Sequence, residues 1–154
     1  MMRPAALIAG LLLLGAPALG QEDMIIDQSK VYVSDASACA AIEDKGMDAF
    51  MDGDFLALTF PDGIQGMEFQ CGFYDIGSRV HTPLLHVDAV CEAPGEVYPD
   101  AFAIAPYDDK TIQVVSSYDA MMVTTGTFEP PGPTTNPGVT LYTRCDTLSE
   151  IPVD

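Results

Sequence analysis

The residues best suited to chemistry in this chain are its four cysteines, Cys39, Cys71, Cys91 and Cys145. No two of them form a Cys-x-x-Cys pair, so their spacing indicates neither a thioredoxin-type redox site nor a zinc site. An even number of such cysteines is typical of disulfides in small domains of oxidising compartments. Cys71 and Cys91 fall on the apolar faces of two successive expected strands. We therefore favour Cys71–Cys91 with Cys39–Cys145, and Cys39–Cys71 with Cys91–Cys145 is the main rival.

Few other side chains are spaced for catalysis. The sequence contains no G-x-S-x-G, H-E-x-x-H, Walker or G-x-G-x-x-G motif. His81 and His86 are the only histidines, and their odd separation along a strand would put them on opposite faces. His86 and Asp88 would project together from a solvent face, and Glu68 with Asp88 on a neighbouring strand would be a carboxylate pair suited to hydrolysis. We expect no catalytic, cofactor or metal site, and Glu68, His86 and Asp88 are the surface candidates.

The N-terminus has the three parts of a secretory signal peptide over residues 1–20. Arg3 is its only charge, residues 5–14 are apolar, and Ala18-Leu19-Gly20 is a small-x-small cleavage site. The apolar run is short for a membrane span. We therefore expect a mature protein that begins at Gln21, is periplasmic or secreted, and is not inserted in a membrane.

The mature chain would be strongly acidic. Its 154 − 20 = 134 residues fit one domain, and its charge is 5 − 23 = −18. Such a surface excludes nucleic acid and anionic lipid as partners, because both are bound through lysine and arginine. Solubility alone is the favoured explanation of this charge. The ligands that it would attract are a cationic protein, a cationic small molecule or a divalent metal, and a cationic protein is the macromolecular partner that we predict.

The elements that position these residues are mostly strands, because apolar residues recur with a period of two. A short strand is expected at residues 31–33, and the meander from Phe55 to Cys145 contains strands near residues 55–60, 67–74, 85–91, 101–105, 111–116 and 139–145, with a further strand around 121–125. In the last strand, Val139, Leu141, Thr143 and Cys145 share a face opposite Tyr142. Met67, Cys71, Cys91 and Cys145 would all lie on apolar faces, so the strand sulfurs would meet inside the sheet.

One short helix precedes this β region. Ser34-Asp35 is an N-cap for the alanine-rich segment 36–42, and Gly46 ends it. We expect the only substantial helix here, followed by an antiparallel meander that forms a small barrel or sandwich. Residues 21–30 would be a polar leader, 31–146 a single β domain stapled by two disulfides, and 147–154 a frayed tail. Residues 128–137, with four prolines, would be an irregular surface excursion.

Several motifs resemble those of small exported four-cysteine proteins of alphaproteobacteria. Their G-x-E-x-x-C strand is matched by Gly66, Glu68 and Cys71, and the cysteine before Gly-Glu by Cys91, Gly95 and Glu96. A final Tyr-x-x-Cys is matched by Tyr142 and Cys145. The resemblance covers most of the mature chain and implies no particular activity.

Periplasmic lysozyme inhibitors share the expected size, export and β architecture with this chain. Gly77-Ser78-Arg79 keeps only the serine and a cation of their inhibitory loop, so this similarity stays a class analogy. Taken together, these features of the sequence predict an exported acidic binding or structural module of the cell envelope without catalytic activity. A hydrolase that uses surface carboxylate pairs is the alternative.

Overall fold

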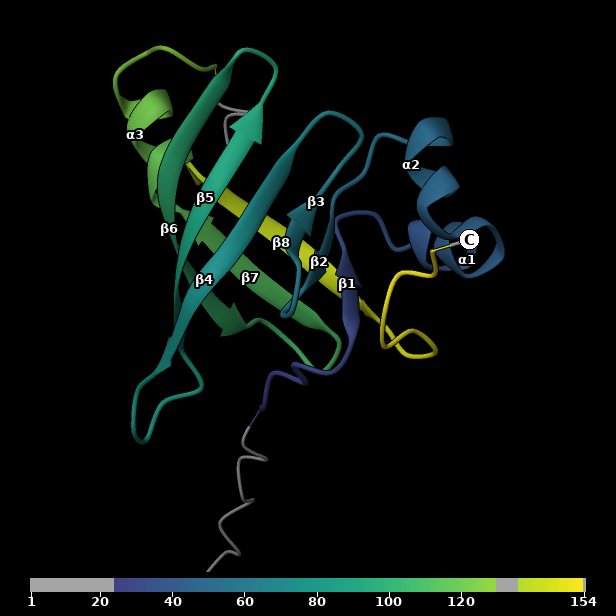
Figure 1. The fold of residues 1–154 in the computed structure, drawn as a ribbon. Helices are drawn as coiled ribbons and strands as arrows, with labels where there is room; N and C mark the ends of the chain where they lie inside the picture. Colours follow the sequence, from purple (N-terminus) through teal and green to yellow (C-terminus); the bar gives the residue numbers. More distant parts are fainter. Residues whose placement is uncertain (1–23, 130–135, 154) are drawn as a thin grey trace, which may run out of the picture.

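Eight antiparallel strands follow one another in chain order around a closed barrel in the computed structural model, which describes residues 24–129 and 136–153 (Figure 1). The strands are β1 (Val31–Val33), β2 (Ala57–Thr59), β3 (Gly63–Gln65), β4 (Gln70–Ser78), β5 (Leu85–Ala93), β6 (Glu96–Pro106), β7 (Thr111–Ser116) and β8 (Val139–Cys145). β1 pairs with β8 as well as with β2, and this closes the sheet. The expected antiparallel meander is confirmed, and it forms a barrel.

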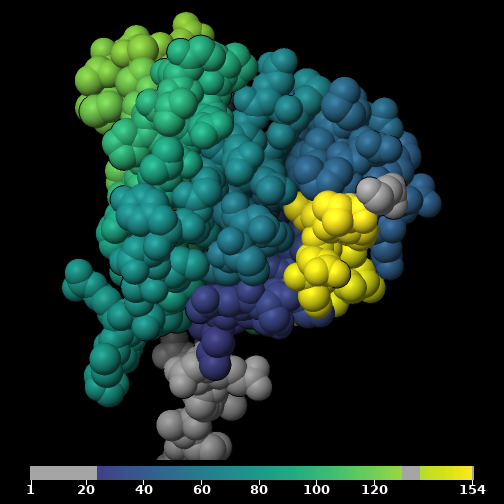
Figure 2. Space-filling view, viewed as in Figure 1, coloured from purple at the N-terminus to yellow at the C-terminus, as the bar shows by residue number. Residues whose placement is uncertain are grey.

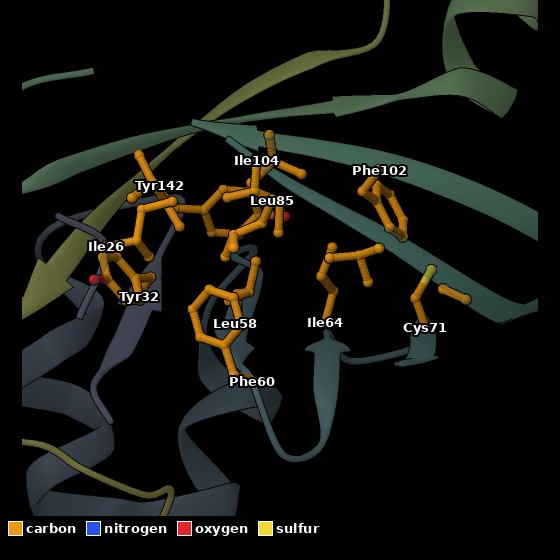
Figure 3. Close-up of a cluster of buried hydrophobic side chains, with 14 of the residues drawn as sticks. Ile26, Tyr32, Leu58, Phe60, Ile64, Cys71, Leu85, Phe102, Ile104 and Tyr142 are labelled. Carbon is orange, nitrogen blue, oxygen red and sulfur yellow. The ribbon is translucent and has the colours of Figure 1, made fainter. Parts of the chain in front are cut away.

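The interior of the barrel is a packed core built from the alternating residues of the strands (Figure 3). In β5 the inward residues are Leu85, Val87, Ala89 and Cys91, as the sequence predicts, and each is at most 6% exposed. The remaining space is filled by Phe60, which follows β2, and by side chains from the other strands: Tyr32, Leu58, Ile64, Phe102, Ile104, Ile112, Val114 and Tyr142. Eight strands give a barrel just wide enough for such filling. The packed side chains of the barrel interior therefore stabilise the fold.

A second apolar cluster lies outside the barrel, over β1, β2 and β8. It is covered by α1 (Ala38–Lys45), a 3-10 helix η1 (Gly46–Asp48) and α2 (Ala49–Asp52), which lie to one side of the barrel in Figure 1. Val31 and Val33 face these helices, whereas Tyr32 between them faces the barrel interior. This part of the barrel wall is thus buried on both faces.

Both favoured disulfides are present, one in each cluster. Cys71 and Cys91 are directly opposite each other on β4 and β5, inside the barrel. Cys39–Cys145 joins α1 to the end of β8 across the outer cluster. The expectation that all strand sulfurs meet inside the sheet is therefore wrong for Cys145, because helices cover the outer face of β8.

The predicted faces of β8 are reversed for the same reason. Tyr142 is 2% exposed inside the barrel, whereas Leu141 is 42% exposed on the outside. Met67 is also misplaced by the prediction: it is 59% exposed, because the chain turns before β4 through a hydrogen bond from Gly66 N to Phe69 O (2.7 Å). Alternation alone cannot show where a second layer covers a strand or where a turn interrupts it.

A helix replaces the strand expected around residues 121–125. α3 (Ser117–Thr124) follows β7, and Ser116 Oγ caps it by accepting a hydrogen bond from Asp119 N (3.0 Å). The prediction that the only substantial helix precedes Gly46 is therefore wrong. Within residues 24–129 and 136–153, no helix is both long and apolar enough to cross a membrane.

The C-terminal segment is packed against the outer cluster. Leu148 is 7% exposed, and its carbonyl accepts a hydrogen bond from Val31 N (3.1 Å). Pro152 O accepts another from Met47 N (3.2 Å). The expectation of a frayed tail is thus wrong for residues 147–153. The expected signal peptide and most of the proline-rich excursion lie outside the described residues.

Candidate functional site

The positive charges of the β domain are gathered on one side of the barrel. Lys110 Nζ lies 2.6 Å from Asp146 Oδ2, and Arg144 Nε lies 3.0 Å from Asp146 Oδ1. Lys30 Nζ donates to the backbone carbonyl of Asp146 (2.9 Å). These hydrogen bonds from Lys110 and Arg144 lower the pKa of the Asp146 carboxyl. Three of the five cations that follow residue 20 therefore meet at the junction of β1 and β8.

The two other cations do not neutralise the carboxylates on the side of the barrel opposite the Asp146 cluster. Lys45 on α1 pairs with Asp52 on α2 (2.7 Å). Arg79 follows the last residue of β4. No lysine or arginine occurs in residues 80–109 or 111–143, which include β5, β6 and α3. These three elements thus contribute acidic but no basic side chains, apart from His86.

A row of carboxylates follows the outer face of β5. The inward position of Leu85, Val87, Ala89 and Cys91 turns the residues between them outward, by the two-residue period of a strand. We call these residues, with their exposed neighbour on β6, the outer β5–β6 face: His86, Asp88, Val90, Glu92 and Val97. His86 Nε2 lies 3.5 Å from Asp88 Oδ1, and Glu92 is exposed. Val90 and Val97 are 44% and 68% exposed.

A β-bulge adds a further carboxylate beside this face. The register of β4 against β5 shifts between Phe73 and Asp75, which makes Tyr74 the extra residue and puts Asp75 opposite Asp88. Like charges directly opposite each other on two strands destabilise the pair. No lysine or arginine is paired with either aspartate among the residues that the structure describes. The bulge therefore creates a concentrated negative potential on the outer wall of the barrel.

The three candidates from the sequence are only partly brought together. His86 and Asp88 share an exposed face, as predicted. Glu68 lies before β4, beyond the Gln70–Glu92 pair, so the Cys71–Cys91 pair separates it from Asp88 along the hairpin. Asp75 is the carboxylate that faces Asp88 instead. The sequence did not reveal Asp75, because the bulge at Tyr74 interrupts the alternation that would have placed it.

A cavity of about 200 Å³ lies elsewhere, beside α1 and α2. Its acidic lining residues are Asp35, Asp52 and Asp54. Asp35 Oδ1 already accepts hydrogen bonds from Ser37 N (2.9 Å) and Ser37 Oγ (2.8 Å), and Asp52 pairs with Lys45. Across the described part of the chain, no three histidine, cysteine or acidic side chains are grouped to hold a metal. This cavity gives no basis for a catalytic or metal site.

A buried aspartate anchors α3 to the barrel. Asp100 is 8% exposed, and its Oδ2 accepts a hydrogen bond from Ser116 Oγ (2.6 Å). Its Oδ1 accepts one from Tyr118 N (2.9 Å). Burial, and then the charge of Asp100, raise the pKa of Asp119 in the first turn of the helix. Two carboxylates thus lie near one another at the base of α3.

Two tyrosines complete the contact between β6 and α3. The rings of Tyr98 and Tyr118 are stacked with centroids 3.8 Å apart. Burial raises the pKa of Tyr98 to about 12, with smaller contributions from the charges of Asp119 and Asp100. The base of α3 is therefore an acidic and aromatic junction rather than an apolar one.

No protein-family model, curated protein or solved structure matches this chain. The resemblance to exported four-cysteine proteins stays a prediction. Function is inferred below from the charge, exposure and geometry of the chain's own residues.

Proposed function

We propose that the mature chain is an exported binding module that associates with a cationic protein through the outer β5–β6 face and the neighbouring Asp75. One observation carries this proposal: four of the five cations that follow residue 20 lie around Asp146 or on α1, the fifth, Arg79, follows β4, and β5, β6 and α3 contain no lysine or arginine. Export is supported by the signal-peptide pattern of residues 1–20 and by two disulfides, which persist in oxidising compartments.

The uneven charge suits association more than solubility. Charges spread evenly would keep copies apart, whereas a face that carries carboxylates and no cations attracts and orients a basic partner. Asp75, Asp88 and Glu92 would receive its lysines and arginines. Val90 and Val97 offer apolar contact area between these charges.

Binding is also favoured over hydrolysis by the position of the carboxylates. Acid–base catalysis uses groups that converge on a substrate in a concave site. Asp75 and Asp88 instead lie on the outer wall of a barrel, and neither lines the cavity beside α1 and α2. Glu68 and Asp88, the carboxylate pair that the sequence predicted for hydrolysis, are separated along the hairpin.

Titration calorimetry against a panel of basic proteins, lysozyme among them, tests the proposal with the chain from Gln21 onward. We expect binding at about 0.1 M salt that weakens strongly towards 1 M, as the Debye length falls from about 10 Å to 3 Å. The triple variant Asp75→Asn/Asp88→Asn/Glu92→Gln should lose at least about tenfold in affinity, because three charge pairs are removed.

A matched control carries the same change in net charge on the other side of the barrel. Asp44→Asn/Asp48→Asn/Glu150→Gln removes three exposed carboxylates from α1, η1 and the C-terminal segment. It should bind nearly as well as the wild type. Equal losses in both variants would show that net charge alone attracts the partner, and absence of binding across the panel would refute the proposal.

A further inference from the structure

Helix α3 carries apolar side chains that the fold does not bury. None of its eight residues is buried. Met121 is 51% exposed on the stripe that it shares with Ser117 and Thr124, and Phe128 just after the helix is 42% exposed. We call Met121, Met122, Val123 and Phe128 the α3 patch. Phe128 belongs to it because its N–H donates to the carbonyl of Met122 (3.2 Å).

The contacts that hold α3 in place leave Met121 and Phe128 exposed and bury Met122 and Val123 only in part. They come from the beginning of the helix: the Ser116 cap, the hydrogen bond from Tyr118 N to Asp100, and the stack of Tyr118 on Tyr98. The helix lies at the edge of the barrel beside the end of β7, and it projects from the surface in the space-filling view (Figures 1 and 2). A helix that is largely apolar yet unburied in its own fold offers a contact surface to another molecule.

The charges around the α3 patch are all negative. Asp119 is half-buried in the first turn, and Glu129 follows Phe128 in the chain and is exposed. Glu96 Oε2 lies 3.5 Å from the hydroxyl of Tyr118. The elements next to the patch, β6 and α3, contain no lysine or arginine. The surface is therefore apolar at its centre and acidic at its rim.

We infer that the α3 patch docks a cationic amphipathic helix of a partner protein. The apolar stripe of that helix would lie on Met121 and Phe128, and its lysines or arginines would reach Glu96, Asp119 and Glu129. Charge complementarity selects this occupant, because an anionic helix or an anionic membrane would be repelled by the same rim. Met121 and Met122 suit the role, since flexible thioethers adapt to varied apolar side chains.

This inference rests on the proposed function and names the class of partner and a second part of its contact surface. The test uses two labelled peptides of about 18 residues with the same leucine and lysine composition. In one, leucines recur at helical spacing. In the other, the order is scrambled so that no apolar stripe forms. Fluorescence anisotropy measures both against the mature chain at low and at high salt.

We expect the amphipathic peptide to bind at least about tenfold more tightly than the scrambled one. Met121→Ser/Phe128→Ser should abolish this difference, and the fold should survive because both residues are exposed. The control Met51→Ser/Val80→Ser removes side chains that are 73% and 82% exposed elsewhere, and it should preserve the difference. Circular dichroism and the unfolding midpoint verify that both variants are folded.

The outcomes separate this inference from the proposed function. Equal, salt-sensitive binding of both peptides would overturn docking at the α3 patch and leave the acidic binding module standing. Tight binding of the amphipathic peptide that survives Met121→Ser/Phe128→Ser would also overturn it. If neither peptide binds at low salt, the result counts against the module and the docking site together.

Discussion

The substitution Asp100→Asn tests how α3 is attached to the barrel. The Asp100 carboxylate accepts hydrogen bonds from Ser116 Oγ (2.6 Å), Tyr118 N (2.9 Å) and Ala101 N (2.7 Å). In the variant, the amide oxygen can still accept from the two backbone N–H groups. The amide nitrogen would face Ser116 Oγ, which would have to accept from it while already accepting from Asp119 N.

The expected loss follows from this geometry. Replacing Oδ2 removes one charge-assisted hydrogen bond, which contributes about 1.5–3 kcal/mol to stability. The end of repulsion between Asp100 and Asp119 offsets part of this loss. We therefore expect the free energy of unfolding to fall by about 1–2 kcal/mol, and Asp100→Ala to cost more because all three acceptors disappear.

Urea unfolding followed by circular dichroism measures the loss, and tyrosine fluorescence is a second probe because the chain has six tyrosines and no tryptophan. Asp109→Asn in the exposed β6–β7 turn is the control. An NMR titration of Asp100→Asn should show a lower pKa for Asp119 than in the wild type, because one cause of its raised pKa is removed. Unchanged stability together with an unchanged Asp119 pKa would refute the anchoring role of Asp100.

Three further predictions concern the disulfide, pH and the C-terminal segment. Cys39→Ala/Cys145→Ala should lower the free energy of unfolding by about 4–5 kcal/mol in the chain-entropy model, since the bridge closes a separation of 106 residues; calorimetric unfolding checks it. Because the pKa of Asp119 is raised in the folded state, protonation of Asp119 stabilises the fold below pH 4, and this contribution is lost as the pH rises through the raised pKa. The free energy of unfolding of the wild type, relative to that of Asp119→Asn, should therefore fall over that range. Urea titrations at several pH values measure this difference. Leu148→Ala should cost about 2–3 kcal/mol in thermal unfolding, because Leu148 is buried; a loss near zero would mean that the segment is not docked.

The strands and disulfides were predictable because one face of most strands is buried and the other is not. β5 is the clearest case, with Leu85, Val87, Ala89 and Cys91 inside the barrel. The prediction of the inward face of β8 failed because α1 covers the outer face of this strand. Burial of Cys145 therefore did not show which face of β8 lies inside the barrel. Sequence alternation reports burial, and it does not distinguish between two buried faces.

The missed helix had a local signal. Ser116 and Asp119 form the S-x-x-D pattern of a helix start before the apolar run Ala120-Met121-Met122, and the structure uses Ser116 as the cap. The β-branched and methionine residues of 121–125 drew the prediction towards a strand. In the candidate site, the charge could be counted from the sequence, but its segregation required the closure of β1 on β8.

That closure also fixes the order in which the molecule can be assembled during synthesis. The hairpin of β4 and β5 is local in the sequence, so it can form as soon as that stretch has emerged, and its bridge joins cysteines only 20 residues apart, so it can form once the hairpin is in an oxidising compartment. β1 must wait for β8, the last strand to be made, before its second edge is paired. Until then α1 lacks both its bridge to Cys145 and part of its packing surface. A nascent chain stopped before residue 139 would therefore hold a preformed hairpin with an open sheet, and its N-terminal strand would stay available to chaperones.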